Sequence, residues 1–556
     1  MCLLRRAQVA SNDIVDNNFI LYTVFRILFV QHLWEEISMH EKNLPGQAVD
    51  ESRRGLLKSA LAVGVTATAA IGMSSVFPLR ALAQDGTPSG SIVFGNAEPP
   101  TSNYWDPAAG FGLVDEQVAS LLYDSLLAFD ESGNVTPGIA TEWMATDDKT
   151  VTLTIRTDAK FHDGTAVTAQ DIKASIDRLG LGELAQSMVV TEGISVNILS
   201  GNKIEVKSPQ VFGPMMNALA YIKILPKANI DSPDNFKGAA NGSGPYKFAS
   251  YDGNIVTLEA NENYWRGAPN TKAVVFRYIE DAQARISALL SGQVDILTRV
   301  SPEDLSRVEG NDDFHVTNIS PPAQIIAIYQ HNGPLGNPKL RRALAHAIDR
   351  EGIAKNVMKG LNKVGASSLP TNVKFYEEQA QKFEYDPEKA RAIVSEEYPN
   401  GVTLRMSTST LVPNQIQIDQ IIAASLEQIG ITVEVERLEV GAFRSSYNTY
   451  DINLNTLVTF NVDPDFILGL YSGGAGEAIF HFNDPEYLEL LAASRVATPE
   501  SRQAAISAAA GYLWDNQVTL YLSDEFWYFI VNNRVEGYRR APLLGEIFVG
   551  EAKVSA

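Results

Sequence analysis

Two aspartates flank a proline in the stretch LVTFNVDPDF, residues 457–466, and their side chains are of a type that does chemistry. Asp463 and Asp465 could act as general acid and base, hold part of a metal site, contact a bound solute, or simply form a turn beside Pro464. Carboxylates that cleave a glycosidic bond stand about 5–10 Å apart on either side of it. Two positions in one turn are too local for that arrangement, so the spacing does not favour a catalytic dyad.

Histidines that could complete a metal or catalytic site are few. Downstream of residue 84 the chain has His162, His315, His331, His346 and His481, and no HExxH or comparable spacing. The pair His162-Asp163 in KFHDG therefore predicts a turn between a strand and a helix, with Asp163 bonding to the local backbone.

Glycine-rich and serine motifs point away from phosphate binding and from hydrolase chemistry. The stretch GSGP, residues 242–245, is not a phosphate loop, because Pro245 lacks an N–H donor and no Lys-Ser/Thr follows. The nucleophile motif G-x-S-x-G does not occur. We interpret GSGP as a structural turn.

Composition excludes several classes of protein. The 556 residues are 45% hydrophobic and 20% charged with a formal net charge of −21, which suits a soluble chain of two or three domains and opposes nucleic-acid binding. The single cysteine, Cys2, excludes zinc fingers, iron–sulfur clusters, intramolecular disulfides and a cysteine nucleophile in the main body.

The N-terminal region has the layout of an export signal. SRRGLLK (52–58) precedes the apolar run 59–77, and Ala-Leu-Ala at 81–83 gives a cleavage site, while paired Arg53 and Arg54 indicate the twin-arginine route. We predict a twin-arginine-type signal peptide over 39–83, and no membrane embedding after its cleavage; a membrane anchor is the less favoured alternative. Residues 1–38 are interpreted as a misassigned extension before Met39, with a first membrane segment at 19–30 as the alternative.

Helical and strand patterns alternate along the rest of the chain. VTLTIR (151–156) alternates like a half-buried strand, and Thr168 and Asp171 have capping-box spacing at the start of a helix. Asp386 and Pro387 predict another helix start. In 418–436 a helix ends at Gly430 and an alternating strand follows. Alternation over this length predicts α/β lobes with helices flanking sheets.

Seven stretches, in a fixed order across about residues 91–545, carry a family resemblance. The stretches are 121–143, 153–179, 241–248 with NGSGPYKF, 261–269 with NENYWRGAP, 285–296, 336–353 and 533–539 with NRVEGYR. Together they resemble the extracytoplasmic solute-binding proteins of ABC transporters, in the family that includes dipeptide-, oligopeptide- and nickel-binding members (family 5).

The resemblance implies a two-lobed α/β periplasmic binding protein of class II type. It implies a lobe I at 84–325 with an extra subdomain inserted at about 130–215, a lobe II at 326–525, and a return to lobe I at 526–556. A hinge between the lobes would let them close over a solute. The implied protein is a periplasmic monomer, not an enzyme and without a cofactor, that delivers its solute to an ABC transporter permease.

The resemblance also marks residues that would contact the solute. Tyr104, Trp105 and Phe111 fall where family members offer contacts from lobe I, with packing as the alternative. Peptide-binding members hold the ligand's amino group with an aspartate just upstream of an acidic-Pro pair, and here that position is Phe460. An aromatic ring forms no salt bridge, so the desolvation cost of a buried ammonium would stay unpaired. This lowers the expectation of an ordinary peptide.

Further contacts and the class of solute remain open at this level. Asp463 or Asp465 could supply a carboxylate with shifted geometry, or only form the turn. In EFWYFIV (525–531), a strand would place Phe526 and Tyr528 on one side and Trp527 and Phe529 on the other, so that Trp527 or Tyr528 lines the cleft. The expected solute is peptide-like, opine-like or an oligosaccharide. A secreted carboxylate-dependent hydrolase and a sensory ligand-binding receptor are the alternatives.

Overall fold

The computed structural model describes residues 90–99, 106–109, 112–182, 184, 186–187, 190, 193–232, 240–458, 463–541, 543 and 545–555. The predicted extension and signal peptide, residues 1–83, lie outside the described residues. Within the described part, no helix is long and apolar enough to cross a membrane.

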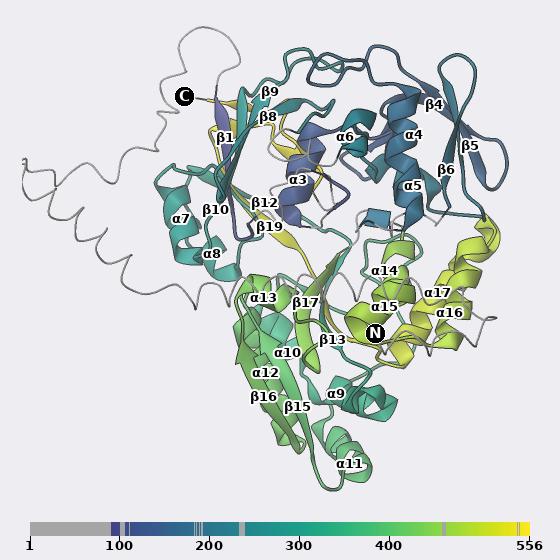
Figure 1. The fold of residues 1–556 in the computed structure, drawn as a ribbon. Coiled ribbons are helices and arrows are strands. Elements are labelled where there is room, and N and C mark those ends of the chain that lie inside the picture. Colours follow the sequence, from purple (N-terminus) through teal and green to yellow (C-terminus); the bar gives the residue numbers. More distant parts are fainter. Residues whose placement is uncertain are drawn as a thin grey trace, which may run out of the picture. The chain divides into compact units, whose positions relative to one another are not determined.

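The first large sheet combines strands from both ends of the described chain (Figure 1). Seven described strands follow one another in space: β12 (Phe314–Ile319), β19 (Trp527–Asn532), β11 (Ile296–Leu297), β1 (Ser91–Asn96), β10 (Ala273–Tyr278), β9 (Ile255–Ala260) and β8 (Tyr246–Tyr251). β1 runs parallel to β10 and β11, and β19 runs antiparallel to β11 and β12.

Both faces of this sheet are covered by helices. In Figure 1, α3 (Leu113–Leu122) lies on one side of β1 and β10, and α7 (Ala282–Leu290) and α8 (Pro302–Ser306) lie on the other. Alternate residues of β1 separate the two cores: Phe94 belongs to the core with α3, and Val93 to the core with α7.

A smaller sheet and the helices α4, α5 and α6 come from residues between β1 and β8. Its four described strands are ordered β4 (Ala140–Ala145), β5 (Thr150–Ile155), β7 (Lys203–Lys207) and β6 (Ser195–Ile198), and α4 (Ala169–Asp177) packs on β6. The predicted capping box is confirmed, because Thr168 Oγ1 accepts from the Asp171 N–H while the Asp171 carboxylate accepts from the Thr168 N–H. The same region contains the β2–β3 hairpin, α5 and α6. Their bounds are Leu127–Phe129, Val135–Pro137, Met215–Tyr221 and Lys227–Asp231.

The KFHDG and GSGP turns fold against each other. His162 Nδ1 accepts from the Gly242 N–H at 3.1 Å, and Asp163 accepts from the Thr165 backbone N–H at 2.8 Å. A Cβ on Gly242 would stand 1.8 Å from the Leu122 carbonyl oxygen, so only glycine fits this approach. Both turns are therefore structural, as the sequence predicts. Burial is the main reason that the pKa of His162 falls to about 4.

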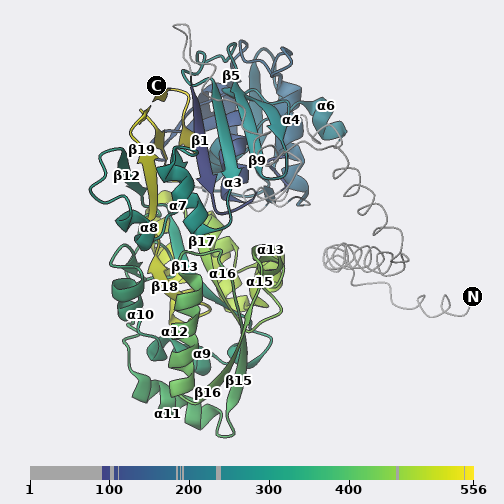
Figure 2. The same ribbon diagram turned by 90° about the vertical axis from the view of Figure 1, so that its left-hand side faces the viewer.

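The second large sheet has its own core. Its described strands are ordered β14 (Lys363–Val364), β18 (Leu520–Asp524), β13 (Ala323–Tyr329), β17 (Ile452–Val458), β15 (Val402–Thr408) and β16 (Ile431–Arg437). Figures 1 and 2 both show α12 (Gln415–Gln428) running along β15 and β16. α12 gives way to β16 through Gly430, at φ +92°, which confirms the predicted helix–glycine–strand unit.

The remaining helices pack around this second sheet, and their starts follow simple rules. They are α9 (Pro338–Ala347), α10 (Arg350–Gly352), α11 (Pro387–Glu397), α13 (Val440–Arg444), α14 (Asp465–Gly469), α15 (Gly473–Phe480), α16 (Pro485–Val496) and α17 (Pro499–Asp515). α11 begins as predicted, with Asp386 as N-cap accepting from the Lys389 N–H at 2.9 Å and Pro387 in the first turn.

Two short connections join the two large sheets. β12 leads into β13 through residues 320–322, and β18 leads into β19 through Glu525 and Phe526. The two connections run side by side, because the Glu525 N–H donates to the Ala323 carbonyl at 2.9 Å. Strand pairs β12–β19 and β13–β18 continue this antiparallel arrangement into the two sheets.

Candidate functional site

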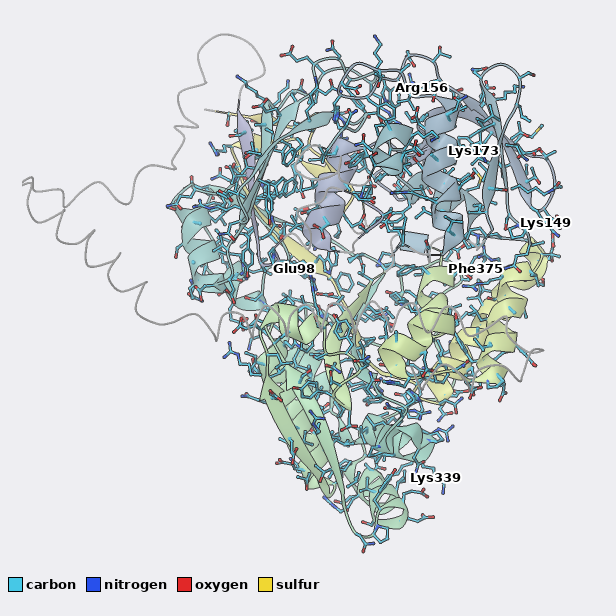
Figure 3. All side chains as sticks on the ribbon, in the orientation of Figure 1. Glu98, Lys149, Arg156, Lys173, Lys339 and Phe375 are labelled. Atoms are coloured by element: carbon cyan, nitrogen blue, oxygen red, sulfur yellow. The ribbon has the colours of Figure 1, made fainter. Side chains whose placement is uncertain are left out.

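Three charged side chains gather where β1, β11 and the β18–β19 connection come together. Glu98 follows the end of β1 by two residues, Arg299 follows the end of β11 by two, and Glu525 lies in the connection. Arg299 donates through Nη2 to Glu525 Oε1 at 2.8 Å and through Nη1 to Glu98 Oε1 at 3.3 Å. Parallel strands bring their carboxyl ends to one edge of a sheet, the usual place for a ligand site in an α/β fold. Glu98 is labelled in Figure 3.

Residues of the second sheet complete this charged cluster. Arg444, at the end of α13, donates to Glu98 Oε2 at 2.6 Å. Arg299 Nη2 also donates to Thr456 Oγ1, on β17, at 3.1 Å. The cluster of Glu98, Arg299, Arg444 and Glu525 therefore ties the two sheets together, and we call it the junction cluster.

Arg299 has an uncommon backbone conformation, and its guanidinium lies beside two carboxylates. Its φ of 50° lies in the left-handed region, which non-glycine residues seldom adopt, and such residues concentrate at functional sites. Burial by itself lowers the pKa of Arg299, but Glu525 and Glu98 more than offset this and raise it above its ordinary value. The guanidinium therefore stays charged.

Several polar atoms of this region have no hydrogen-bond partner among the described residues. They are Arg299 Nε, Glu525 Oε2 and Trp527 Nε1. The Arg299 guanidinium lies 4.9 Å from the centre of the Trp527 ring, within cation–π range. Buried polar atoms cost free energy when they are unpaired, so this part of the chain is ready to bond a polar ligand or water.

Trp527 and Tyr528 occupy opposite faces of β19, as strand alternation predicts. Trp527, 1% exposed, packs with Phe529 in the core under α3, whereas Tyr528 packs on the α7 side and donates from its hydroxyl to the Leu361 carbonyl at 3.3 Å. Both border a pocket with an empty volume of about 280 Å³, open solvent included, which Arg299 and Glu525 also line. Contact of either residue with solute remains a prediction.

Asp463 and Asp465 are each paired with an arginine of a nearby helix, α17 or α16. Asp463, 2% exposed, accepts from Arg502 Nη2 at 2.9 Å and from the Asp465 N–H at 3.0 Å. Asp465 accepts from Arg495 Nε at 2.7 Å. Burial raises the pKa of Asp463 and Arg502 offsets only part of that rise. The two carboxylates thus fix the start of α14 onto α16 and α17, which accounts for both without a ligand.

Arg502 reaches beyond its own helix. Its guanidinium lies 5.2 Å from the ring centre of Phe375, labelled in Figure 3, and a Cβ on Gly213 would meet its Cζ at 2.8 Å. Gly213 precedes α5 in the region of the small sheet. The Asp463 pair therefore positions a side chain that touches both large parts of the chain.

Other predicted contacts cannot be placed. Tyr104, Trp105, Phe111 and Phe460 lie outside the described residues, so their part in the site stays a prediction. No group of three or more His, Cys, Asp or Glu side chains in the described part of the chain could hold a metal ion.

Sequence reasoning missed Glu98, Arg299 and Arg444. Glu98 and Arg299 each follow the end of a strand, and a search for charged residues just past the carboxyl ends of strands would have found both. Arg444 carries no such signal, because its role depends on where α13 packs.

Comparison with known proteins gives consistent matches. Residues 134–478 match the family described as "Bacterial extracellular solute-binding proteins, family 5 Middle". The chain is 25% identical over 505 residues to the "Probable D,D-dipeptide-binding periplasmic protein DdpA" of Escherichia coli (strain K12), with 86% of this chain and 96% of that protein covered.

Solved structures show a shared fold. The dipeptide binding protein from Pseudoalteromonas sp. SM9913, in complex with Met-Leu, superimposes with a TM-score of 0.78 at 20% identity and covers 84% of this chain and 100% of its own. AgaA from A. tumefaciens R10, in complex with agropinic acid, gives 0.76 at 24% identity and covers 84% and 99%.

Proposed function

The chain belongs to family 5 of the bacterial extracellular solute-binding proteins, and from this premise we propose which solute it takes and how it holds it. It has the two-domain α/β fold of periplasmic binding proteins. It is a solute-binding receptor of the kind that serves ABC importers, and its relatives are periplasmic binding proteins.

The proposed mechanism is closure of two lobes about the paired connections at 320–322 and 525–526. The proposed lobe I is 84–325 with its subdomain at about 130–215, lobe II is 326–525, and 526–556 return to lobe I. The change from β18 in one sheet to β19 in the other supports this division. A solute that binds the closed state better than the open one shifts the population toward closure.

The junction cluster is the observation that carries the proposal. Glu98 and Arg299 come from the first sheet's edge, and Arg444 and Thr456 from the second lobe. Ion pairs that span two lobes form only when the lobes approach, and their buried, partly unpaired atoms offer contacts to a polar solute. Closure and recognition thus depend on the same residues.

The solute we favour is a small organic molecule without a simple peptide amino terminus. Phe460 stands where an aspartate would hold that amino group, and the carboxylates of Asp463 and Asp465 are already paired with arginines. The E. coli relative is named as a D,D-dipeptide-binding protein, and one similar structure holds agropinic acid. A peptide-like or opine-like solute fits these observations, with an oligosaccharide as the further candidate.

The proposed cellular setting follows from the same function. The receptor is exported by the twin-arginine route, is not embedded in the membrane after cleavage, acts as a monomer without a cofactor, and passes its solute to an ABC transporter permease. A sensory role at a chemoreceptor is the alternative reading of the same binding event. The ion pairs of Asp465 with Arg495 and of Asp463 with Arg502 argue against the hydrolase alternative, because both proposed catalytic carboxylates are engaged by arginines.

The test is to identify what the protein carries. Mass spectrometry of solute released from the purified protein, followed by calorimetry with that solute, should give a single class of ligand, and small-angle scattering should show compaction on binding. Glu98→Gln should weaken binding, whereas Glu378→Gln, in an exposed surface pair with Lys382, should not. If no peptide, opine, sugar or metal complex binds and scattering never changes, the protein is not a receptor of this kind.

A further inference from the structure

One buried arginine outside the junction cluster has no carboxylate partner among the described residues. Arg540, in β21 (Arg539–Arg540), which pairs with β22 (Ile547–Phe548), is 7% exposed. Nε, Nη1 and Nη2 of its guanidinium have no hydrogen-bond partner among the described residues except the neighbouring hydroxyl of Tyr538. A buried guanidinium without a carboxylate partner is costly, and the described residues supply no carboxylate to Arg540.

The surroundings of Arg540 are aromatic and donor-rich. Its Cζ lies 4.5 Å from the ring centre of Phe529 and 5.8 Å from that of Trp527. Trp527 Nε1 is itself without a hydrogen-bond partner among the described residues, and the Tyr538 hydroxyl interacts with the Arg540 guanidinium. Burial lowers the pKa of Arg540, the neighbouring Tyr538 raises it in part, and no carboxylate among the described residues contributes.

A further donor without a partner in the described part of the chain belongs to the same face of the first sheet. Asn96 ends β1, is 1% exposed, and bonds through Oδ1 to Thr298 Oγ1 at 3.0 Å, while its Nδ2 has no partner in the described part of the chain. Leu297 pairs with Ile530, so the next residues, Thr298 and Phe529, are neighbours on the opposite face. Asn96, Thr298, Phe529 and Trp527 thus share the α3 face at the carboxyl ends of β1 and β11.

The charges around Trp527 do not balance. Arg299 and Arg540 both approach its ring, at 4.9 and 5.8 Å. Together with Arg444 they set three positive charges against the two negative charges of Glu98 and Glu525. One positive charge is left over in a buried region, and one negative charge would neutralise it.

We propose that Arg540, Trp527 and Asn96 form a subsite for a single carboxylate of the transported solute. The proposal deepens the receptor function and rests on it. Arginine matches a carboxylate with two parallel N–H donors, and the indole and amide N–H groups supply further donors to the same oxygens. One carboxylate, rather than a doubly charged phosphate, matches the single excess charge. A solute with an acid group fits this subsite.

The bare subsite is tested with acetate as the probe. Thermal unfolding of the purified protein at pH 7.5 is followed in sodium acetate, sodium chloride and methyl phosphate at equal ionic strength. Acetate should raise the melting temperature above that in chloride, and methyl phosphate should raise it less than acetate. No acetate effect beyond chloride, or a larger effect of methyl phosphate, overturns the carboxylate subsite.

Two arginine variants separate binding from packing. Arg540→Met should lower acetate affinity by about tenfold to a hundredfold, the loss expected for charge-assisted hydrogen bonds. It should leave the ligand-free protein at least as stable, because it removes an unpaired buried charge. Arg539→Met is the matched control, since Arg539 pairs at the surface with Glu131 and Glu551 and should not affect acetate binding. An unchanged acetate response in Arg540→Met refutes the proposal.

A third variant decides the matter if Arg540→Met does not fold. Asn96→Asp brings a carboxylate to the subsite, so it should raise the melting temperature of the ligand-free protein and remove the acetate response. A lower melting temperature with the acetate response intact would contradict the subsite.

Paired acid and amide ligands distinguish the carboxylate subsite from the receptor function. N-acetyl-dialanine and its C-terminal amide are titrated by calorimetry against the wild type, together with the solute found by mass spectrometry and its amide. Equal affinity of acid and amide removes the carboxylate subsite and leaves a receptor. Absence of any solute and of any compaction, with the acetate response present, removes the receptor function and leaves an anion site.

Discussion

Replacing Asp463 with asparagine is the sharpest test of what the DPD turn does. The side chains of Asp463 and Arg502 are 3% and 13% exposed, and their ion pair is 2.9 Å long. Removing one partner of a buried pair costs about 3–5 kcal/mol, because the other charge is left uncompensated. Asparagine still offers Oδ1 to the Asp465 N–H, so we place the loss in unfolding free energy near the lower end, about 3 kcal/mol.

Urea denaturation followed by tryptophan fluorescence measures this loss. Glu378→Gln breaks an exposed pair whose side chains are 48% and 63% accessible, and it should change the unfolding free energy by less than about 0.5 kcal/mol. The double variant Asp463→Asn with Arg502→Met removes both charges and should recover most of the loss.

A purely structural role for Asp463 predicts that Asp463→Asn lowers stability without lowering solute affinity. Asp463→Asn should bind the identified solute with nearly unchanged affinity once the protein is folded. An unfolding free energy within about 0.5 kcal/mol of the wild type, below the range for a buried pair, would refute the structural role. Loss of solute binding in a fully stable variant would instead make Asp463 a ligand contact, and loss of a turnover reaction would revive the hydrolase alternative.

Three further predictions rest on other parts of the structure. The pKa of His162 is about 4 in the folded protein and about 6.5 in the unfolded chain, so the imidazole is neutral in both states above pH 6.5. Below that pH the unfolded chain binds the proton first, and acid therefore favours unfolding. Urea titrations should show the unfolding free energy fall by up to about 3 kcal/mol between pH 6.5 and 4, and this contribution should be absent in His162→Gln. Gly242→Ala should abolish soluble expression, because its Cβ would stand 1.8 Å from a backbone oxygen. Gly441→Ala is the control, since a Cβ there would enter open space within α13. Its melting temperature should change by no more than about a degree, through the difference in helix propensity alone. Glu98→Gln leaves Arg444 without its carboxylate and should weaken solute affinity, measured by calorimetry, by about tenfold or more. With solute present, small-angle scattering should show a larger average size for the variant than for the wild type. Unchanged affinity would mean that the junction cluster does not support closure.

Local structure was predictable from the sequence because it depends on neighbouring residues. The capping box of Thr168 and Asp171, the helix start at Asp386, and the opposite faces of Trp527 and Tyr528 all follow from spacing along a few residues. The family resemblance added the two-domain fold, which spacing alone does not specify.

The junction cluster was not predictable in this way. Glu98 and Arg299 are 201 positions apart in the sequence, and Arg299 and Glu525 are 226 apart. Their meeting depends on the register of β1, β11 and β19, and nothing local to any of the three residues encodes that register. Arg540 was missed for a related reason, because only the packed structure shows that its side chain is buried.

The place of β19 in the first sheet has a consequence for synthesis of the protein. This strand inserts between β12 and β11, yet it is formed by residues 527–532, after every described strand of the second sheet. All described strands of the second sheet are therefore synthesised before the first sheet can be completed. More than 200 residues are added after β12 before its partner strand β19 is made. A chain that stops after residue 525 would hold the described strands of the second sheet but lack β19 in the first, so such a fragment should fail to fold the first sheet.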